Sequence, residues 1–490
     1  MNPFLSSILS RNLIDRSQRH RRNVLAKYRE LLDVSGRTPD QIRTHQNRKL
    51  TGLLRHAALQ VPRWQSQLPA PDEITEDHAQ ELLRRLAIMD RAAIQADPQS
   101  FVARDAQHTV EDATGGSTGT PLVFLVDRET QVAREASLYW ADSLAGWRYG
   151  DRIAMLWGSD KDNRSAAADA KLAFRWWIDN RRWFNAFNMG EEQMAAFHRA
   201  MNRFRPHIIV AYAGSLEVYA RFLESLGHGQ GTMDNGRETM GDRQGTIDDG
   251  RKTMGQGQKG FDEQNLSLAH RPLPIANCKS VGYPLRALVA SAEMLTPRAR
   301  ETAERVFGKP VFNRYGSREF GALAAEDGGG QGLRINPSDC ILEVDSTDPV
   351  NLPGPLLVTY LANHTMPFIR YNTGDLACMS ADGTRILSLA GRESDTIRTA
   401  SGKMIHGEFF THLLYRANYV REFQFVQETL NQYRLLLVAQ QPESKAIEDS
   451  IRADIYEELG ADISLELAYV EEIPVLSSGK RKFTISKIAS

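Results

Sequence analysis

Continuous apolar runs alternate with helical patterns in the middle of this chain, and this alternation most constrains its fold. The runs at 152–157 and 207–212 read R-I-A-M-L-W and H-I-I-V-A-Y, which is typical of strands buried on both faces. A third run at 285–295 ends in a turn of small residues, and a helical pattern follows at 297–306. Strands and helices in this order predict an α/β domain built on an open sheet.

Size and charge narrow the class of protein further. The chain has 490 residues, of which 41% are hydrophobic and 25% charged, as in ordinary globular proteins of two or three domains. Sixty basic residues balance 61 acidic ones, so no global field favours nucleic acid or membrane as a partner. The three cysteines lack ligand spacing, and no apolar run is long enough to cross a bilayer. Since the first residues also make a poor signal peptide, we expect a cytoplasmic protein.

The sequence divides into three parts with one insertion. Residues 1–110 read as helices that precede the α/β domain, which we place at 111–391. Residues 392–490 carry strand patterns at 422–427, 433–439 and 464–470 and a helical pattern at 445–459, enough for a small α+β domain. The segment 229–260 repeats G-T-M-D-N-G-R-E-T-M-G in a closely similar form, is rich in glycine, and is predicted to be a disordered surface insertion.

The residues N-R-Y-G-S-R-E at 313–319 follow the apolar segment 307–312, and F-G-A-L-A-A-E at 320–326 reads as a short helix. This pattern places an aromatic ring (Tyr315), a glycine (Gly316), a hydroxyl (Ser317) and a carboxylate (Glu319) in one turn after a strand. The carboxyl ends of strands are where open α/β sheets bind nucleotides. The alternative is a turn that only caps its helix.

A glycine-rich loop provides a second candidate site. T-G-G-S-T-G-T-P at 114–121 precedes a β-type run at 122–126, and it combines inward-facing backbone N–H groups with hydroxyls that suit phosphate oxygens. It lacks the Lys-Ser/Thr pair of a Walker loop, and a plain hairpin turn is the alternative interpretation.

Three further features resemble parts of a nucleotide site. The stretch 358–377 reads as two strands with a tight turn at 373–375, where Asp375 can accept hydrogen bonds from vicinal ribose hydroxyls. The stretch A-Y-A-G-S at 211–215 leads into a helix with Ser215 as its N-cap. Near the end, S-S-G-K presents Lys480 on a flexible turn.

In their order and spacing, these stretches resemble the adenylate-forming superfamily of acyl-CoA synthetases, adenylation domains and luciferases. The similarity is greatest to the phenylacetate–CoA ligase family and its CapK-like homologues from capsular-polysaccharide loci. It covers about 53–485 without the insertion and rests on L-R-H-A-A-L-Q-V-P, T-G-G-S-T-G-T-P, Y-G-S-R-E, P-F-I-R-Y-N-T-G-D-L, G-R-E-S-D and S-S-G-K. The resemblance implies a large adenylate-forming domain followed by a small mobile lid.

The resemblance also implies roles for individual residues. The phosphate loop would hold the β- and γ-phosphates through Thr114, Gly115, Gly116, Ser117, Thr118 and Gly119. The nucleotide would be bound by Glu293, Asn313, Tyr315, Gly316, Ser317, Asp375 and Arg392. Glu319 would help to place Mg²⁺, and Lys480 would bridge the substrate carboxylate and the α-phosphate. The acid pocket would draw on Tyr212, Ser215, Ser291 and Ala292.

Three positions depart from the pattern of the family. Thr120 stands where many relatives carry a lysine, and Arg318 replaces the usual Ser/Thr before the glutamate. Ser394 occupies the place of the common hinge Asp or Lys, a role that Asp395 would take over.

The implied activity is ATP- and Mg²⁺-dependent ligation of a carboxylic acid to coenzyme A through an acyl adenylate. One alternative keeps the adenylation but passes the acyl or AMP group to a carrier protein, an amine or a hydroxyl. Another is a nucleotide-binding scaffold without turnover. The identity of the acid, the oligomeric state and the role of the insertion are not readable from the sequence.

Overall fold

A computed structural model describes most of the chain. The described residues are 3–114, 121–157, 180–184, 191–228, 282–392, 396–400, 404–415, 420–439, 445–460, 462–473 and 483–488. The insertion at 229–260 lies outside them.

The first hundred described residues are helical, as the sequence predicts. The helices are α1 (Pro3–Ser35), α2 (Pro39–Gln60), α3 (Pro62–Gln65), α4 (Ala79–Arg85) and α5 (Arg91–Ala96), with the 3-10 turn η1 (Pro98–Phe101). Thr38 begins α2 with a capping box, because its side chain and that of Gln41 each bond the other's backbone N–H. Pro62 ends α2 and starts α3, which confirms the predicted stop. None of the described helices is long and apolar enough to span a membrane.

An 11-stranded sheet forms the centre of the described structure, in the order β10-β11-β12-β13-β9-β8-β7-β6-β5-β3-β4. Its strands are β3 (Ile153–Leu156), β4 (Arg181–Phe184), β5 (Ile208–Tyr212), β6 (Ala287–Ser291), β7 (Val311–Ser317), β8 (Gly321–Ala325), β9 (Leu333–Ile335), β10 (Cys340–Val344), β11 (Gly354–Tyr360), β12 (Tyr371–Met379) and β13 (Arg385–Arg392). Strands β4, β3, β5, β6 and β7 run parallel, and the remaining pairs are antiparallel.

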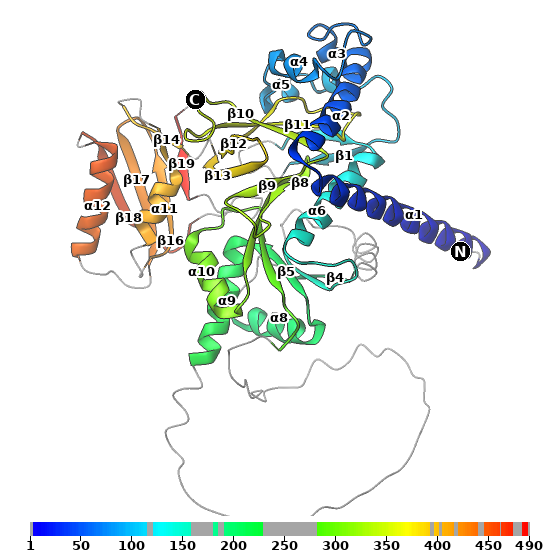
Figure 1. The fold of residues 1–490 in the computed structure, drawn as a ribbon. Helices are drawn as coiled ribbons and strands as arrows, with labels where there is room; N and C mark the ends of the chain where they lie inside the picture. Colours follow the sequence, from blue (N-terminus) through cyan, green and yellow to red (C-terminus); the bar gives the residue numbers. More distant parts are fainter. Residues whose placement is uncertain are drawn as a thin grey trace, which may run out of the picture.

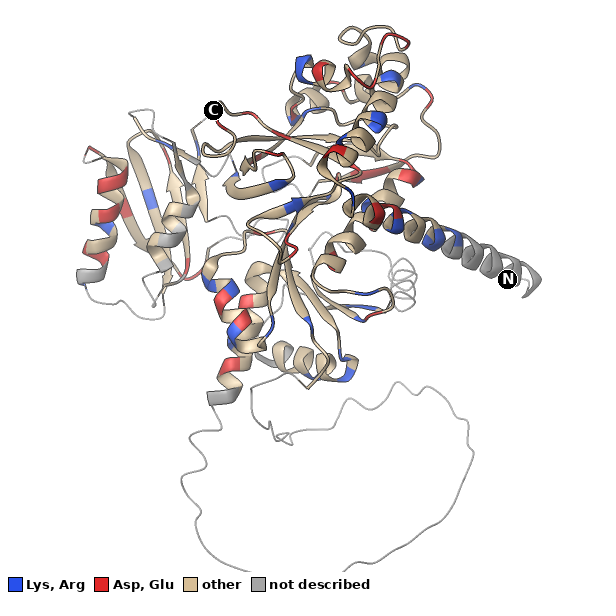
Figure 2. Cartoon of the chain, viewed as in Figure 1, with Lys and Arg blue, Asp and Glu red and all other residues tan. Residues whose placement is uncertain are grey.

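Helices cover both faces of the parallel part (Figure 1). They are α6 (Arg128–Leu144), α8 (Glu191–Phe204), α9 (Ala213–His228) and α10 (Pro297–Phe307). In β5, Ile209 packs into the core under α8, α9 and α10, whereas Ile208 and Val210 pack into the core under α1 and α6. This burial on both faces explains why the strand appears in the sequence as an uninterrupted apolar run. Basic and acidic side chains are mixed along α10 (Figure 2).

A second sheet and its helices form the C-terminal part. A short pair, β14 (Thr396–Arg398) and β15 (Met404–His406), leads into α11 (Gly407–Tyr415). The strands β16 (Val420–Gln427), β17 (Gln432–Ala439), β18 (Ser464–Tyr469) and β19 (Thr484–Ser486) form a sheet in the order β18-β17-β16-β19, with α12 at Lys445–Leu459. This C-terminal part has its own hydrophobic core, in which Phe410 and Phe425 stack with ring centroids 3.7 Å apart. The predicted strands and helix of this part are confirmed, while the exact domain boundary at 392 stays a prediction.

Three local predictions are wrong. The segment 320–326 contains the strand β8 instead of a helix, because β7 and β8 form a hairpin in which Ser317 pairs with Gly321. The predicted turn at 373–375 lies inside β12. Helix α9 already begins at Ala213, so Ser215 lies within its first turn and is not the N-cap.

Candidate active site

Three residues that the sequence singles out meet between β7, β12 and β13. The hydroxyl of Tyr315 donates a hydrogen bond to Oδ2 of Asp375 over 2.6 Å. Nε of Arg392 donates to Oδ1 of the same carboxylate over 3.2 Å. Asp375 and Arg392 are also register partners in the β12–β13 ladder. Tyr315 lies 60 residues before Asp375, so the fold brings distant parts of the chain to one carboxylate.

A bulge in β12 aims the Asp375 side chain. The β11–β12 register jumps from Leu357–Asn372 to Pro355–Leu376, so residues 373–375 are unpaired with β11, and Gly374 has a φ of +76°. The side-chain oxygen of Asn372 accepts from Gly374 N–H, and that of Thr373 accepts from Asp375 N–H. These two bonds satisfy backbone N–H groups of residues that have no partner on β11, and bulges of this kind commonly redirect a side chain beside an active site.

Burial affects the protonation of the tyrosine in this group. Burial and then the negative charge of Asp375 raise the pKa of Tyr315 well above its ordinary value. The Tyr315 hydroxyl therefore keeps its proton at neutral and moderately alkaline pH. It remains a hydrogen-bond donor to Asp375 under these conditions.

The tip of the β7–β8 hairpin positions Glu319. A Cβ on Gly316 would lie 2.0 Å from the Gly321 carbonyl oxygen, so only glycine permits this close approach. At the tip, Phe320 is 1% exposed and packs its ring against Tyr360 and Phe368, with both centroids 5.3 Å away. This anchor holds the neighbouring Glu319 against the core.

Glu319 is a buried carboxylate whose oxygens could coordinate a cation. It is 7% exposed, and among the described residues it has no hydrogen bond or ion pair. Burial and then the charge of Glu319 raise the pKa of Tyr371, which shows that the carboxylate lies near that hydroxyl. A buried carboxylate without a partner suits a cation. The described residues contain no cluster of three or more metal-ligating side chains, but Mg²⁺ commonly takes one or two carboxylates and completes its shell with phosphate and water.

The predicted phosphate loop joins two strands that pair as a β-hairpin. Strand β1 (Val110–Ala113) pairs antiparallel with β2 (Val123–Val126), and Thr114 closes the base through N–H donation to the Leu122 carbonyl over 2.9 Å. The predicted β-run is confirmed as β2. The alternative interpretation, a hairpin turn, describes the strands on either side of the loop, and a phosphate-binding role for the loop stays a prediction. Gly115, Gly116, Ser117, Thr118 and Gly119 lie outside the described residues, as do Lys480, Ser394 and Asp395.

Two arginines contact the base of this loop. Nη2 of Arg91 donates to Oγ1 of Thr114 over 3.2 Å, and Nη1 of Arg318 donates to the Ala113 carbonyl over 3.3 Å. In the sequence, Arg318 stands out only as a departure from the family pattern, and Arg91 does not stand out. No local signal identifies Arg91, which lies 23 residues before Thr114.

The predicted acid-pocket residues cluster at the ends of β5 and β6. Tyr212 stacks on Trp157 with ring centroids 4.3 Å apart. Ala292 has a φ of +67°, which costs an alanine about 1–2 kcal/mol and is the kind of strain that collects at functional sites. Glu293 accepts a hydrogen bond from Gly214 N–H over 3.0 Å at the N-terminus of α9.

Two predicted residues already serve the fold. Ser291 is 6% exposed, donates to the Arg314 carbonyl over 3.1 Å and accepts from Nε of Arg314 over 3.3 Å. The Asn313 backbone N–H donates to Glu326 over 2.8 Å, while Ser317 is exposed. The ligand-binding roles of these residues stay predictions.

Comparisons with known proteins show what the chain as a whole is similar to. The CapK C-terminal domain family matches residues 397–487. Protein CapK of Staphylococcus aureus is 20% identical over 419 residues, which cover 83% of this chain and 80% of that protein. A 2-hydroxyisobutyryl-CoA ligase structure in the postadenylation state, in complex with R3-HIB-AMP, superposes with a TM-score of 0.59 at 14% identity, over 90% of this chain and 88% of that one.

The chain has the adenylate-forming fold. A second ligase, the anthranilate CoA ligase AuaEII in complex with anthranoyl-AMP, covers 83% of this chain and 74% of its own with a TM-score of 0.50 at 15% identity. These matches confirm the predicted similarity to CapK and the α/β fold of acyl-adenylate-forming ligases with a C-terminal domain. Within the adenylate-forming fold, the Tyr315, Glu319 and Asp375 side chains come from two separate segments of the large sheet, the β7–β8 hairpin and β12.

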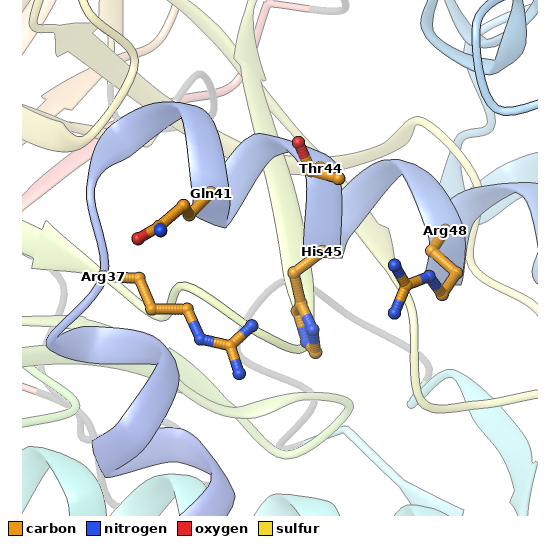
Figure 3. A pocket seen from close by; sticks show the side chains of 5 residues that line it. All are labelled: Arg37, Gln41, Thr44, His45 and Arg48. Atoms are coloured by element: carbon orange, nitrogen blue, oxygen red, sulfur yellow. The ribbon is translucent and has the colours of Figure 1, made fainter.

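A hollow elsewhere on the molecule involves none of the predicted residues. It has a volume of about 270 Å³ and is lined by Arg37, Gln41, Thr44, His45 and Arg48, which Figure 3 shows around α2 and the turn before it. Its basic side chains already have partners, because Arg37 bonds Asp33 over 2.7 Å, His45 bonds Ser338 over 3.0 Å and Arg48 lies 3.8 Å from Glu76. We therefore place the candidate active site at Asp375 and not in this hollow.

Proposed function

We propose that this chain is an AMP-forming ligase, which activates a carboxylic acid with ATP as an acyl adenylate and passes the acyl group to coenzyme A. The observation that carries the proposal is the meeting of Tyr315 and Arg392 on Asp375 beside the buried Glu319. The ligases with the same fold are described as complexes with acyl-AMP, which supports this choice of chemistry.

In this proposal each group of the site has one task. The Asp375 carboxylate accepts hydrogen bonds from ribose hydroxyls while Tyr315 and Arg392 hold its orientation. Glu319 is the residue that would hold Mg²⁺, which neutralises phosphate charge when bound. Lys480 would place its ammonium group between the acid and the α-phosphate, where negative charge accumulates during attack.

The finer assignment rests on the resemblance noted in the sequence. We propose a phenylacetate–CoA ligase-like enzyme of the cytoplasm, whose acid is bound at the ends of β5 and β6 around Tyr212 and Ala292. The C-terminal sheet would carry Lys480 toward the site for adenylation and away from it for thioester formation.

A pyrophosphate-release screen over a panel of carboxylic acids, with and without coenzyme A, tests the proposal. We expect acid-dependent release of pyrophosphate and a thioester when coenzyme A is present. We also expect loss of both in Asp375→Ala. Adenylation without a thioester would instead indicate a carrier protein or another acceptor. A folded protein that releases no pyrophosphate with any acid would refute adenylate formation.

The role of Lys480 has its own test. Lys480→Ala is expected to abolish adenylation but to leave thioester formation from a synthetic acyl adenylate intact. Lys487→Ala serves as the control, because the partner of the Lys487 side chain among the described residues is Glu428 on the surface. Equal loss of both reactions in folded Lys480→Ala contradicts the mobile-lid mechanism.

A further inference from the structure

Tyr371 is a core tyrosine beside the candidate site to which the proposed function gives no task. It is the first residue of β12 and precedes Asp375 on the same strand. Its backbone pairs with Val358 of β11 and forms a bridge with Met89 of the N-terminal part. Only 4% of the residue is exposed. The large sheet and the N-terminal part therefore fix the position of this residue.

The Tyr371 ring packs against the aromatic residues that anchor the tip of the β7–β8 hairpin. Its centroid lies 6.0 Å from that of Phe320 and 5.1 Å from that of Phe368, in both cases edge to face. Phe320 directly follows Glu319, the carboxylate that could coordinate a cation. Tyr371 is thus connected to Glu319 through ring packing and to Asp375 through the backbone of β12.

The Tyr371 hydroxyl can still form hydrogen bonds and reaches solvent. It has no hydrogen-bond partner among the described residues. It is nevertheless not one of the fully enclosed polar atoms without a partner, a group that includes the Tyr360 hydroxyl of the same core. The small exposed area of Tyr371 therefore includes its hydroxyl, whereas the ring is buried.

The charged groups of the candidate site act on this hydroxyl. Burial and then the charge of Glu319 raise the pKa of Tyr371. The charge of Asp375 raises it as well, whereas those of Arg91 and Arg392 lower it. Since the pKa is raised as a result, the hydroxyl keeps its proton at neutral and moderately alkaline pH. It is a neutral donor that can bond an anionic oxygen of a ligand.

The chemistry of a nucleotide indicates what this donor can reach. In the proposed function, Asp375 bonds the ribose, and Glu319 would hold Mg²⁺ on the phosphates. The α-phosphate joins the ribose to the outer phosphates, so it must span the space between these two carboxylates. A hydroxyl that both carboxylates influence, and that reaches solvent, is therefore placed to meet the α-phosphate.

We propose that the Tyr371 hydroxyl donates a hydrogen bond to the α-phosphate of the bound nucleotide. This inference deepens the proposed function and rests on it. During adenylation a bond forms between a carboxylate oxygen of the acid and the α-phosphorus. The bond from that phosphorus to the bridging oxygen breaks, and its electron pair leaves on pyrophosphate. Tyr371 keeps its proton throughout and stabilises negative charge on the α-phosphate oxygens.

Titration with AMP and with adenosine separates this contact from a structural role. Both ligands are titrated calorimetrically against the full-length wild type and Tyr371→Phe, with a chelator present to exclude divalent cations. The phenylalanine ring retains the packing against Phe320 and Phe368. We expect Tyr371→Phe to bind AMP about 10-fold more weakly, as for a lost hydrogen bond to a charged group. Adenosine has no phosphate, so its affinity should stay within about twofold of wild type.

Two variants serve as controls. Tyr360→Phe removes the enclosed hydroxyl of the same core and should change neither affinity. Tyr315→Phe acts on the ribose through Asp375, so it should weaken AMP and adenosine alike.

Unchanged AMP affinity in Tyr371→Phe overturns the inference and leaves the proposed function intact. Equal weakening of AMP and adenosine in this variant also overturns it, because a structural role would have that effect. A selective loss of AMP affinity supports the contact with the α-phosphate. If the wild-type protein in that case releases no pyrophosphate with any acid, the contact stands and the proposed function is refuted.

Discussion

Removal of one hydroxyl group tests whether the candidate site is assembled as described. In Tyr315→Phe, Asp375 loses the donor at 2.6 Å and keeps only Arg392, whose side chain is 36% exposed. A hydrogen bond to a charged group contributes about 1.5–3 kcal/mol, and we take the lower end because Tyr315 is only partly buried. About 1.5 kcal/mol corresponds to roughly a tenfold change in an equilibrium constant.

We therefore expect Tyr315→Phe to bind AMP about tenfold more weakly, because the carboxylate is no longer held in the orientation that the ribose requires. Since the pKa of Tyr315 is raised, the hydroxyl donates throughout neutral and mildly alkaline pH. The tenfold difference should thus be the same at pH 6.5 and pH 8.5. Isothermal calorimetry with AMP measures it, and thermal unfolding reports any change in stability.

Tyr360→Phe is the matched control for this experiment. It also removes a buried tyrosine hydroxyl in the same core, but no partner for that hydroxyl exists in the described part of the chain. We expect its AMP affinity to equal that of wild type. The reasoning is refuted if Tyr315→Phe binds AMP as tightly as wild type, or if Tyr360→Phe loses as much affinity.

Three other perturbations test the surrounding structure. Gly316→Ala should open the β7–β8 hairpin, because its Cβ would lie 2.0 Å from the Gly321 carbonyl oxygen. Pyrophosphate exchange should then fall more than about 100-fold in an activity assay, and thermal unfolding measures the accompanying loss of stability. Asp339→Asn should cost about 3–5 kcal/mol in urea unfolding, since it leaves Lys49, 2.6 Å away, without its charged partner. Burial favours the neutral form of Asp339 and acts to raise its pKa, but the charges of Lys49 and Lys27 outweigh burial and lower the pKa. The stabilisation from the Asp339 carboxylate is therefore present above pH 3.8 and is lost as the pH falls further. Excision of 229–260 should leave exchange activity intact; a folded but inactive deletion contradicts the insertion hypothesis.

The sequence correctly predicted the strands and helices whose burial is visible in their own hydrophobic pattern. Strands β5 and β6 are apolar except at their last residues because both faces are buried, and α12 spans the predicted residues 445–459. The segment 320–326 misled the prediction because alanine and leucine suit either a helix or a buried strand. Its hairpin is decided by the approach of Gly316 to Gly321, which is a contact between strands and not a local preference.

The candidate site was predictable in its residue types but not in its geometry. Tyr315 and Asp375 stood out as single residues, yet only the β12 bulge shows how the carboxylate reaches the tyrosine. Thr373-Gly374-Asp375 has the composition of a turn, and the neighbouring strand β11 converts it into a bulge. Arg91 could not be found from the sequence, because its contact with the loop depends on how the N-terminal helices pack against β12.

Arg392 occupies a position with consequences beyond the site. It is the last residue of β13 and shares the Asp375 carboxylate, while the first strand of the C-terminal part begins only four residues later. A ligand that bonds Asp375 would share that carboxylate with Arg392, which is the last described residue before the C-terminal part and which we call the joint. Thermodynamic linkage makes any influence of the ligand on the joint mutual: the state of the joint that the ligand favours must bind the ligand more tightly, by the same factor by which the ligand favours that state. The joint is thus a place where affinity could be tuned without touching any group that contacts the ligand.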